Sequence, residues 1–222
     1  MKKIFLFLFF TLNLLQFLSA TDSRINIVEL DEKIDKHIEN LPKGDLKPIS
    51  YVKELLDYMY VFDQQIRVIF MQNRVVSPSL VELMQKMDDI HTSKMKEILK
   101  IHGWITISKF GTDYDHKAWI LIQHADHDPF FQAGVLFILS KLLDTGDTDK
   151  QSYAYLYDRV AVNFPQLGMR QRYGTQLISK DNHNFELEPY EGSLKDVDDR
   201  RREMGLETLD NYLRQHKKMY EL

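Results

Sequence analysis

The side chains best placed to do chemistry lie at the end of an apolar stretch, residues 118–128. The stretch begins with large apolar residues and ends in groups that can bind a proton, a metal ion or a ligand. An unpaired polar group at the end of a buried element is costly, so partners from elsewhere in the chain are expected. The five polar residues are Gln123, His124, Asp126, His127 and Asp128.

His124 and Asp126 are the candidate catalytic residues. A histidine can act as a general acid or base, and a carboxylate can hold it in one tautomer. Asp126 is therefore expected to orient His124 or to bind a divalent ion. The stretch lacks an HExxH motif and the chain has no cysteine, so its spacing matches no dedicated metal site. The metal and any cofactor stay unknown, and none is strongly indicated.

Two charged residues stand on the apolar face of the helix expected after Ser50. Asp63 falls in the centre of that stripe, and Arg67 lies one turn later at its edge. A carboxylate in that position needs a partner. Two interpretations stay open: an ion pair that joins helices, or the wall of a binding site. His91 lies in the middle of the next apolar stripe, where a satisfied core histidine is expected.

Two later segments add polar candidates. Asp158 and Arg159 are neighbours on a helix, so at most one of them is expected to face His124. The residues that alternate along the segment 171–176 are expected to share one side of a strand. With these, the binding candidates are Asp63, Arg67, Gln123, Asp158, Arg159, Gln171, Tyr173 and Thr175.

Hydrophobic periodicity predicts a mainly α fold, a compact bundle of five to six helices with a small C-terminal β-hairpin, preceded by a signal peptide. Ser77 and Asp128, each followed by proline, are expected to begin helices, as is Asp113 or Asp115. The arginines of the run 200–202 are expected to lie on a solvated face. Helices are expected at about residues 27–39, 50–70, 77–101, 113–127, 129–144, 149–163 and 196–222, and strands at 172–178 and 185–190 around turn residues 180–184.

The N-terminus has the pattern of a secretory signal peptide. Lys2 and Lys3 precede an apolar run, and small residues follow before Thr21. Cleavage would leave an exported protein, periplasmic or secreted, without an integral membrane segment. The expected organisation is a signal peptide at 1–20, a polar leader at 21–48, and one helical domain at 49–222 with its hairpin at about 171–190. Loss of two lysines takes the net charge from −4 to −6, which argues against a nucleic-acid partner.

Taken together, the polar pieces resemble a bacterial family, domain of unknown function 6624. The resemblance covers about residues 50–212, with His91 standing where Asn is expected and Ile105 where Pro is expected. It carries no established activity, but it implies that the polar pieces gather into one constellation. The matching pieces are Asp63-Gln64 with Arg67, Asp88 before Gly103-Trp104, Gln123-His124-Ala125-Asp126, Asp158-Arg159-Val160, Gln171 with Tyr173-Gly174-Thr175-Gln176, and Arg200 and Arg201 before Gly205-Leu206.

Two functions follow from the constellation, and the sequence leaves the choice between them open. The first is a ligand-binding or interaction module of the cell envelope, whose small-molecule or protein ligand is unknown. The second is a hydrolase or transferase that uses His124 as general acid/base, with Arg67 or Arg159 as an anion clamp. Whether the protein is an enzyme is therefore unresolved by the sequence.

Overall fold

The computed structural model describes residues 27–72, 77–179 and 185–220. Within these ranges the chain forms nine α-helices, one 3-10 turn and a two-stranded antiparallel sheet, so the mainly α prediction is confirmed. The elements are α1 (Ile27–Glu39), α2 (Ile49–Gln72), α3 (Pro78–His102), α4 (Ile107–Phe110), α5 (Thr112–Gln123), α6 (Pro129–Leu142), α7 (Lys150–Asn163), η1 (Pro165–Leu167), β1 (Leu177–Ser179), β2 (Phe185–Leu187), α8 (Leu194–Glu203) and α9 (Leu209–Tyr220).

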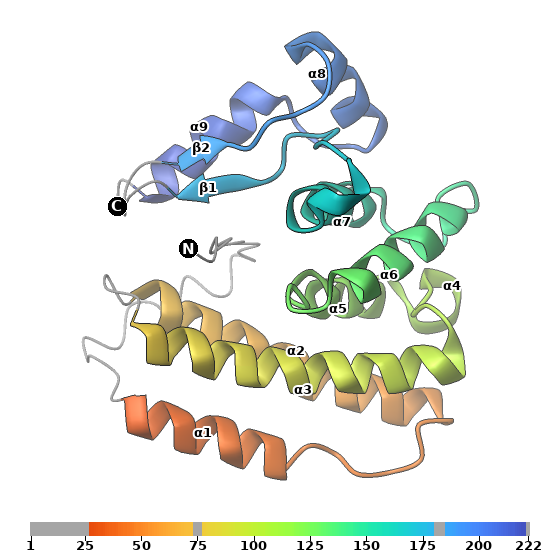
Figure 1. Ribbon diagram of the computed structural model, residues 1–222. Coiled ribbons are helices and arrows are strands. Elements are labelled where there is room, and N and C mark those ends of the chain that lie inside the picture. The colour runs from red at the N-terminus through yellow and green to blue at the C-terminus, as the bar shows by residue number, and fades with distance from the viewer. Residues whose placement is uncertain (1–26, 73–76, 180–184, 221–222) are drawn as a thin grey trace.

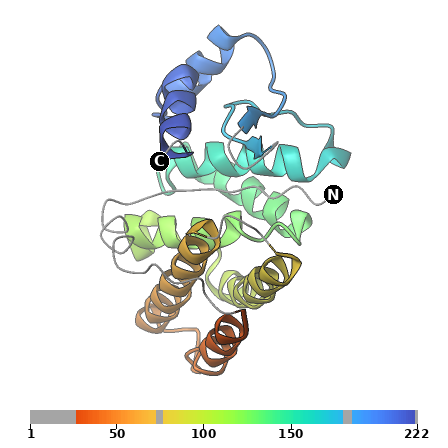
Figure 2. The same ribbon diagram turned by 90° about the vertical axis from the view of Figure 1, so that its left-hand side faces the viewer.

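The helices stack in layers, from α1 at one end to α8 and α9 at the other (Figures 1 and 2). Helices α2 and α3 run side by side next to α1. Helix α5 comes next and contacts both of them as well as α6 and α7. The element that carries the polar cluster is therefore central to the fold.

Local signals set several of the helix ends. Ser77 caps α3, because its hydroxyl accepts a hydrogen bond from the Leu80 N–H at 3.2 Å, and Pro78 follows it. Gly103 ends that helix at φ 70°, a conformation that favours glycine. Asp128 caps α6 through the Phe131 N–H at 3.0 Å. These boundaries agree with the sequence expectations.

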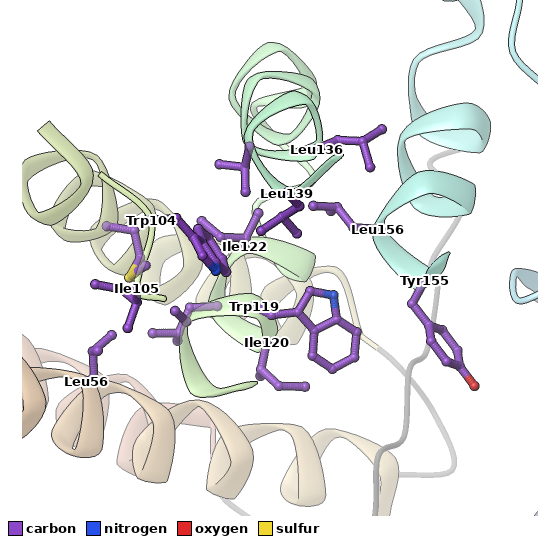
Figure 3. Close-up of a cluster of buried hydrophobic side chains, with 14 of the residues drawn as sticks. Leu56, Trp104, Ile105, Trp119, Ile120, Ile122, Leu136, Leu139, Tyr155 and Leu156 are labelled. Carbon is purple, nitrogen blue, oxygen red and sulfur yellow. The ribbon is translucent and has the colours of Figure 1, made fainter. Parts of the chain in front are cut away.

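Helix α5 is apolar on nearly every side because it is buried on nearly every side. Trp119 is 1% exposed, and Ala118 and Ile122 are fully buried. Figure 3 shows Trp119, Ile120 and Ile122 from α5 among side chains of the surrounding elements, including Leu56 from α2 and Leu156 from α7. This packing fixes the axial position of α5, and hence the place of His124 just beyond its end.

The expected count of five to six helices is wrong, for three physical reasons. The connector after Trp104 contains the single-turn helix α4. The C-terminal stretch divides into α8 and α9 because Gly205 adopts φ 71° between them. The helix expected at 27–39 within the polar leader forms as α1 and packs on the domain, with Leu30 and Ile34 buried in a cluster that includes Met87 of α3, so it adds to the count.

Three local expectations also need correction. The first strand spans only 177–179, and residues 172–176 form a loop instead. Helix α5 begins after Gly111, whereas Asp115 is buried and accepts hydrogen bonds from Trp104 Nε1 at 2.6 Å and the Thr148 hydroxyl at 2.9 Å. In the arginine run, Arg201 is 1% exposed.

The signal-peptide segment and the turn residues 180–184 lie outside the described residues. Among the helices that are described, none combines the length and the apolar character needed to cross a bilayer.

Candidate functional site

The imidazole of His124 lies between a carboxylate and a guanidinium from α2. His124 is the residue at which α5 ends, and its side chain is 8% exposed. Its Nδ1 lies 2.9 Å from Asp63 Oδ1, and Arg67 Nε donates to the same Nδ1 at 2.8 Å. Asp63 and Arg67 are one turn apart on α2, which brings both to one face. The prediction that Asp126 orients His124 therefore fails, since Asp63 holds that position.

Because Asp63 and Arg67 share Nδ1, a neutral His124 can adopt either of two tautomers. A protonated Nδ1 donates to Asp63 and leaves Nε2 with a lone pair. An unprotonated Nδ1 accepts from Arg67 and leaves Nε2 as an N–H donor. Nε2 itself has no hydrogen-bond partner in the described part of the chain.

Asp88 on α3 completes this group, and the list of candidates from sequence omitted it. Arg67 Nη2 donates to Asp88 Oδ1 at 2.6 Å and lies 3.3 Å from Asp63 Oδ1. One guanidinium thus serves two carboxylates. The available sequence signal was the position of Asp88 one turn before His91 and its place among the matching family pieces.

The pKa values of the two carboxyls that share Arg67 are shifted in opposite directions. Burial opposes the charge on Asp63, but Arg67 and His124 outweigh it and hold the pKa of Asp63 below its ordinary value. Burial raises the pKa of Asp88 to about 8 against the pull of Arg67, and the charges of Asp63 and Asp126 add to the rise. Of the two carboxyls, Asp63 is therefore the one that favours the ionised form, and Asp88 is the one that keeps its proton to higher pH.

His124 is uncharged at neutral pH. Burial lowers its pKa, and the neighbouring Arg67 acts in the same direction, while Asp63 partly opposes both. A neutral imidazole can exchange a proton at Nε2 without first losing a charge.

A second group forms around Asp126, just beyond the end of α5. Arg159 from α7 holds its carboxylate with a fork, Nε to Oδ1 at 2.8 Å and Nη2 to Oδ2. Asn163 Nδ2 and Gln132 Nε2 donate to the same Oδ1 at 2.7 and 3.2 Å. Arg159 Nη1 donates to Gln176 Oε1 at 3.2 Å. All three guanidinium nitrogens of Arg159 therefore have acceptors, so this residue joins elements and is not poised as an anion clamp.

The two groups lie within electrostatic range of one another. The charge of Asp126 contributes to raising the pKa values of Arg67 and Asp88, and the charge of Arg159 contributes to lowering the pKa of His124. The Asp126 side chain is 39% exposed, whereas Arg67 is 13% exposed. The constellation therefore reaches the surface at Asp126 and becomes more enclosed toward His124.

Asp158 has a different task from its neighbour Arg159. It is fully buried and accepts from the backbone N–H groups of Arg172 at 2.7 Å, Tyr173 at 3.2 Å and Thr175 at 2.9 Å, and from the Thr175 hydroxyl at 3.0 Å. Burial raises the pKa of Asp158 to about 6 although these donors act to lower it. The carboxylate organises loop 171–176 around itself, which is a structural role.

The remaining loop candidates support that loop. Gln171 Oε1 accepts from the Gln176 N–H at 2.7 Å, and its Nε2 donates to the Glu188 carbonyl at 2.7 Å. Arg201 Nη1 donates to the Tyr173 carbonyl at 2.7 Å. Gln176 connects this loop to Arg159. Sequence reasoning omitted Gln176 from its candidates, although its place among the matching family pieces was an available signal.

Gln123 points into the core, away from His124. It is 2% exposed, and its amide oxygen faces Trp119 Nε1 at 3.0 Å and the Leu156 N–H at 2.9 Å. The structure therefore brings together Asp63, Arg67 and His124, with Asp126 and Arg159 beside them. It places Gln123, Asp158, Gln171, Tyr173 and Thr175 in structural contacts instead. In the described ranges, no three acidic, histidine or cysteine side chains are arranged to hold a metal ion.

The fold and the site together define a mainly helical domain with a buried carboxylate–arginine–histidine network. The chain belongs to a family of unknown function (DUF6624), whose model matches residues 50–222. No curated protein and no solved structure matches the chain. The family match includes every residue of the network and begins after α1.

Proposed function

We propose that this protein is an exported ligand-binding module of the cell envelope, and that a small polar ligand binds at His124 and Arg67. One observation carries the proposal: each of these side chains is held through part of its nitrogens and keeps one nitrogen without a hydrogen-bond partner among the described residues, while 8% of the His124 side chain and 13% of the Arg67 side chain are exposed. His124 is held through Nδ1, and no described residue bonds to its Nε2. Arg67 is held through Nε and Nη2, and within the described ranges its Nη1 has no partner.

The free groups define the chemistry of the ligand. Arg67 Nη1 offers N–H donors, His124 Nε2 offers a donor or an acceptor by tautomer, and the exposed Asp126 carboxylate offers an acceptor. Because Asp63 and Asp126 offset the charges of Arg67 and Arg159, the site has little net charge. It therefore suits a small ligand with both accepting and donating groups better than a highly charged anion.

Ring signals of His124 can test this proposal. We expect titration of the full mature chain with glycine, acetate or inorganic phosphate to shift the His124 ¹⁵Nε2 resonance, with glycine the strongest because it carries both kinds of group. Because His124→Gln lacks this resonance, glycine binding to that variant is measured by calorimetry and should be lost, whereas the binding and the shift should both persist in His127→Gln, whose side chain contacts Asp89 at 3.2 Å on the surface. Binding that is unchanged in His124→Gln would refute the site. Unfolding of His124→Gln alone would identify the network as purely structural.

A hydrolase or transferase is the second candidate, because the Asp63–His124 contact resembles the carboxylate–imidazole pair of general acid–base catalysis. With Nδ1 protonated toward Asp63, Nε2 could take a proton from water or from a substrate hydroxyl. Asp63→Asn should then abolish turnover of a test ester such as p-nitrophenyl acetate while keeping the ligand-induced shift. Equal ester turnover in Asp63→Asn and the unmodified chain would exclude this role.

Export rests on the N-terminal pattern of residues 1–20 alone. The mature protein isolated from the envelope or medium should begin at Thr21 by mass spectrometry. Recovery from the cytosol with Met1 retained would overturn that part of the proposal.

A further inference from the structure

Helix α1 is joined to the family domain by a buried pair of histidines. His37 of α1 and His91 of α3 approach each other with their Nε2 atoms 2.9 Å apart, and they are 4% and 2% exposed. Helix α1 lies before residue 50, where the family match begins. The pair therefore connects a helix that lies outside the family match to the matched domain.

The surroundings of His37 fix its ring tightly. The ring stacks between Phe62, at 3.8 Å between centroids, and Tyr58, at 4.6 Å, both from α2. The Tyr58 hydroxyl also donates to the His37 carbonyl at 3.2 Å. A ring held on two faces and at one nitrogen cannot turn away to solvate a new charge without moving α1.

The contact requires both rings to be neutral or to share one proton. A hydrogen bond between two Nε2 atoms needs one N–H and one lone pair. His91 Nδ1 is enclosed and has no partner in the described part of the chain. An unsatisfied lone pair there costs less than an unsatisfied N–H, so His91 is assigned as the Nε2–H donor and His37 as the acceptor. Two charged rings would place two donors face to face.

Some of the groups around the pair favour protonation of the two histidines, and others oppose it. Asp63 of α2 favours protonation of both rings, and the C-terminal dipole of α1 favours it at His37. At His91, Arg67 of α2 and His124 oppose it. Burial outweighs these charges and lowers the pKa of His37 to about 4 and of His91 to about 3.

We propose that α1 is a pH-sensitive latch, which packs on α2 and α3 through His37 and His91 at neutral pH and is released in mild acid. Release would expose Leu30 and Ile34 of α1 together with the apolar surface that they cover, which includes Ile66 and Met87.

The direction of the pH response follows from the difference in pKa between packed and released histidines. A released histidine has a pKa near 6.5, above that of the packed ring. The stabilisation that His37 and His91 give to docked α1 is therefore present in full above pH 6.5 and is lost as the pH falls toward 4. At pH 5 each histidine would shift the docking equilibrium by about 30-fold toward release, and the two together by up to about 1000-fold.

Other contacts hold α1 with little dependence on these rings. Lys86 of α3 lies 2.8 Å from Asp31 and 2.6 Å from Asp35, but all three side chains are at least 40% exposed. Exposed ion pairs contribute little to stability, so the histidine pair should dominate the response between pH 7.5 and pH 5.

Hydrogen exchange on the full mature chain can test the latch. After correction for intrinsic exchange rates, we expect the protection of α1 amides to fall at least 30-fold from pH 7.5 to pH 5 and to stay well below that of α5 at both pH values, because α1 opens without the rest of the domain. In the double variant His37→Phe/His91→Leu the fall should disappear, because both rings are replaced by groups that do not titrate. His127→Gln is the matched control and should behave like the unmodified chain.

Three outcomes would overturn the proposal. They are equal protection of α1 at both pH values, protection of α1 that equals that of α5 at pH 5, and a fall of the same size in the double variant. If the double variant does not fold, titration of the two rings in the unmodified chain replaces it. Ring resonances that titrate near pH 6.5 without any loss of α1 protection would then refute the latch.

Discussion

Replacing Asp158 should separate loop 171–176 from α7. The fully buried carboxylate is the common acceptor for three backbone N–H groups and one hydroxyl, at 2.7 to 3.2 Å. In Asp158→Ala those donors lose their acceptor, and those of Tyr173 and Thr175 stay enclosed. The loop also positions Gln176 for its contact with Arg159, so the effect should extend to the edge of the candidate site.

The expected cost combines two opposing terms. Hydrogen bonds to a charged group contribute roughly 1.5–3 kcal/mol each. Removing the carboxylate also removes the cost of burying its charge, which is several kcal/mol. The net loss in the free energy of unfolding should be about 3–5 kcal/mol for Asp158→Ala. Asp158→Asn should lose less, because its amide oxygen keeps some acceptors while its NH₂ group faces an N–H donor.

Urea denaturation followed by circular dichroism would measure these differences. Asp199→Ala is the matched control, since Asp199 is an acidic helix residue whose ion pairs with Lys195 and Arg202 lie on the surface, and we expect no measurable change. A loss below about 1 kcal/mol for Asp158→Ala would refute the reasoning. It would mean that the cost of burying the charge cancels the hydrogen bonds, and that other contacts hold the loop.

Two further substitutions test separate parts of the structure. Arg159→Lys should lower the free energy of unfolding by about 1–3 kcal/mol, because an ammonium cannot reproduce the two-nitrogen fork on Asp126; thermal unfolding that matches the unmodified chain would contradict this role. Gly174→Ala should cost about 1–2 kcal/mol, because φ is 63° and the new Cβ would lie 3.1 Å from Leu209 Cδ1. Gly134→Ala, on a helix with nothing within 4 Å, should instead be neutral or stabilising, and the same response at both glycines would show that backbone conformation is not the cause.

Much of the secondary structure was predictable because its causes are local. Apolar spacing, the caps at Ser77 and Asp128 and the glycine at position 103 act over a few residues. The helix count was wrong where those causes are weak. A single turn such as α4 is too short to show a period, and the break between α8 and α9 depends on one glycine.

By itself the sequence determined that Asp63 and His124 would need partners, but it did not determine that Arg201 would be buried. Asp63 lies in the middle of an apolar stripe, and His124 follows an all-apolar helix, so both had to find partners. Only the tertiary structure decided who the partners are. Asp63 and not Asp126 contacts His124, and Asp158 turns to the loop while Arg159 turns to Asp126. These choices depend on the rotation and crossing of α2, α5 and α7, which long-range packing sets and no local pattern encodes.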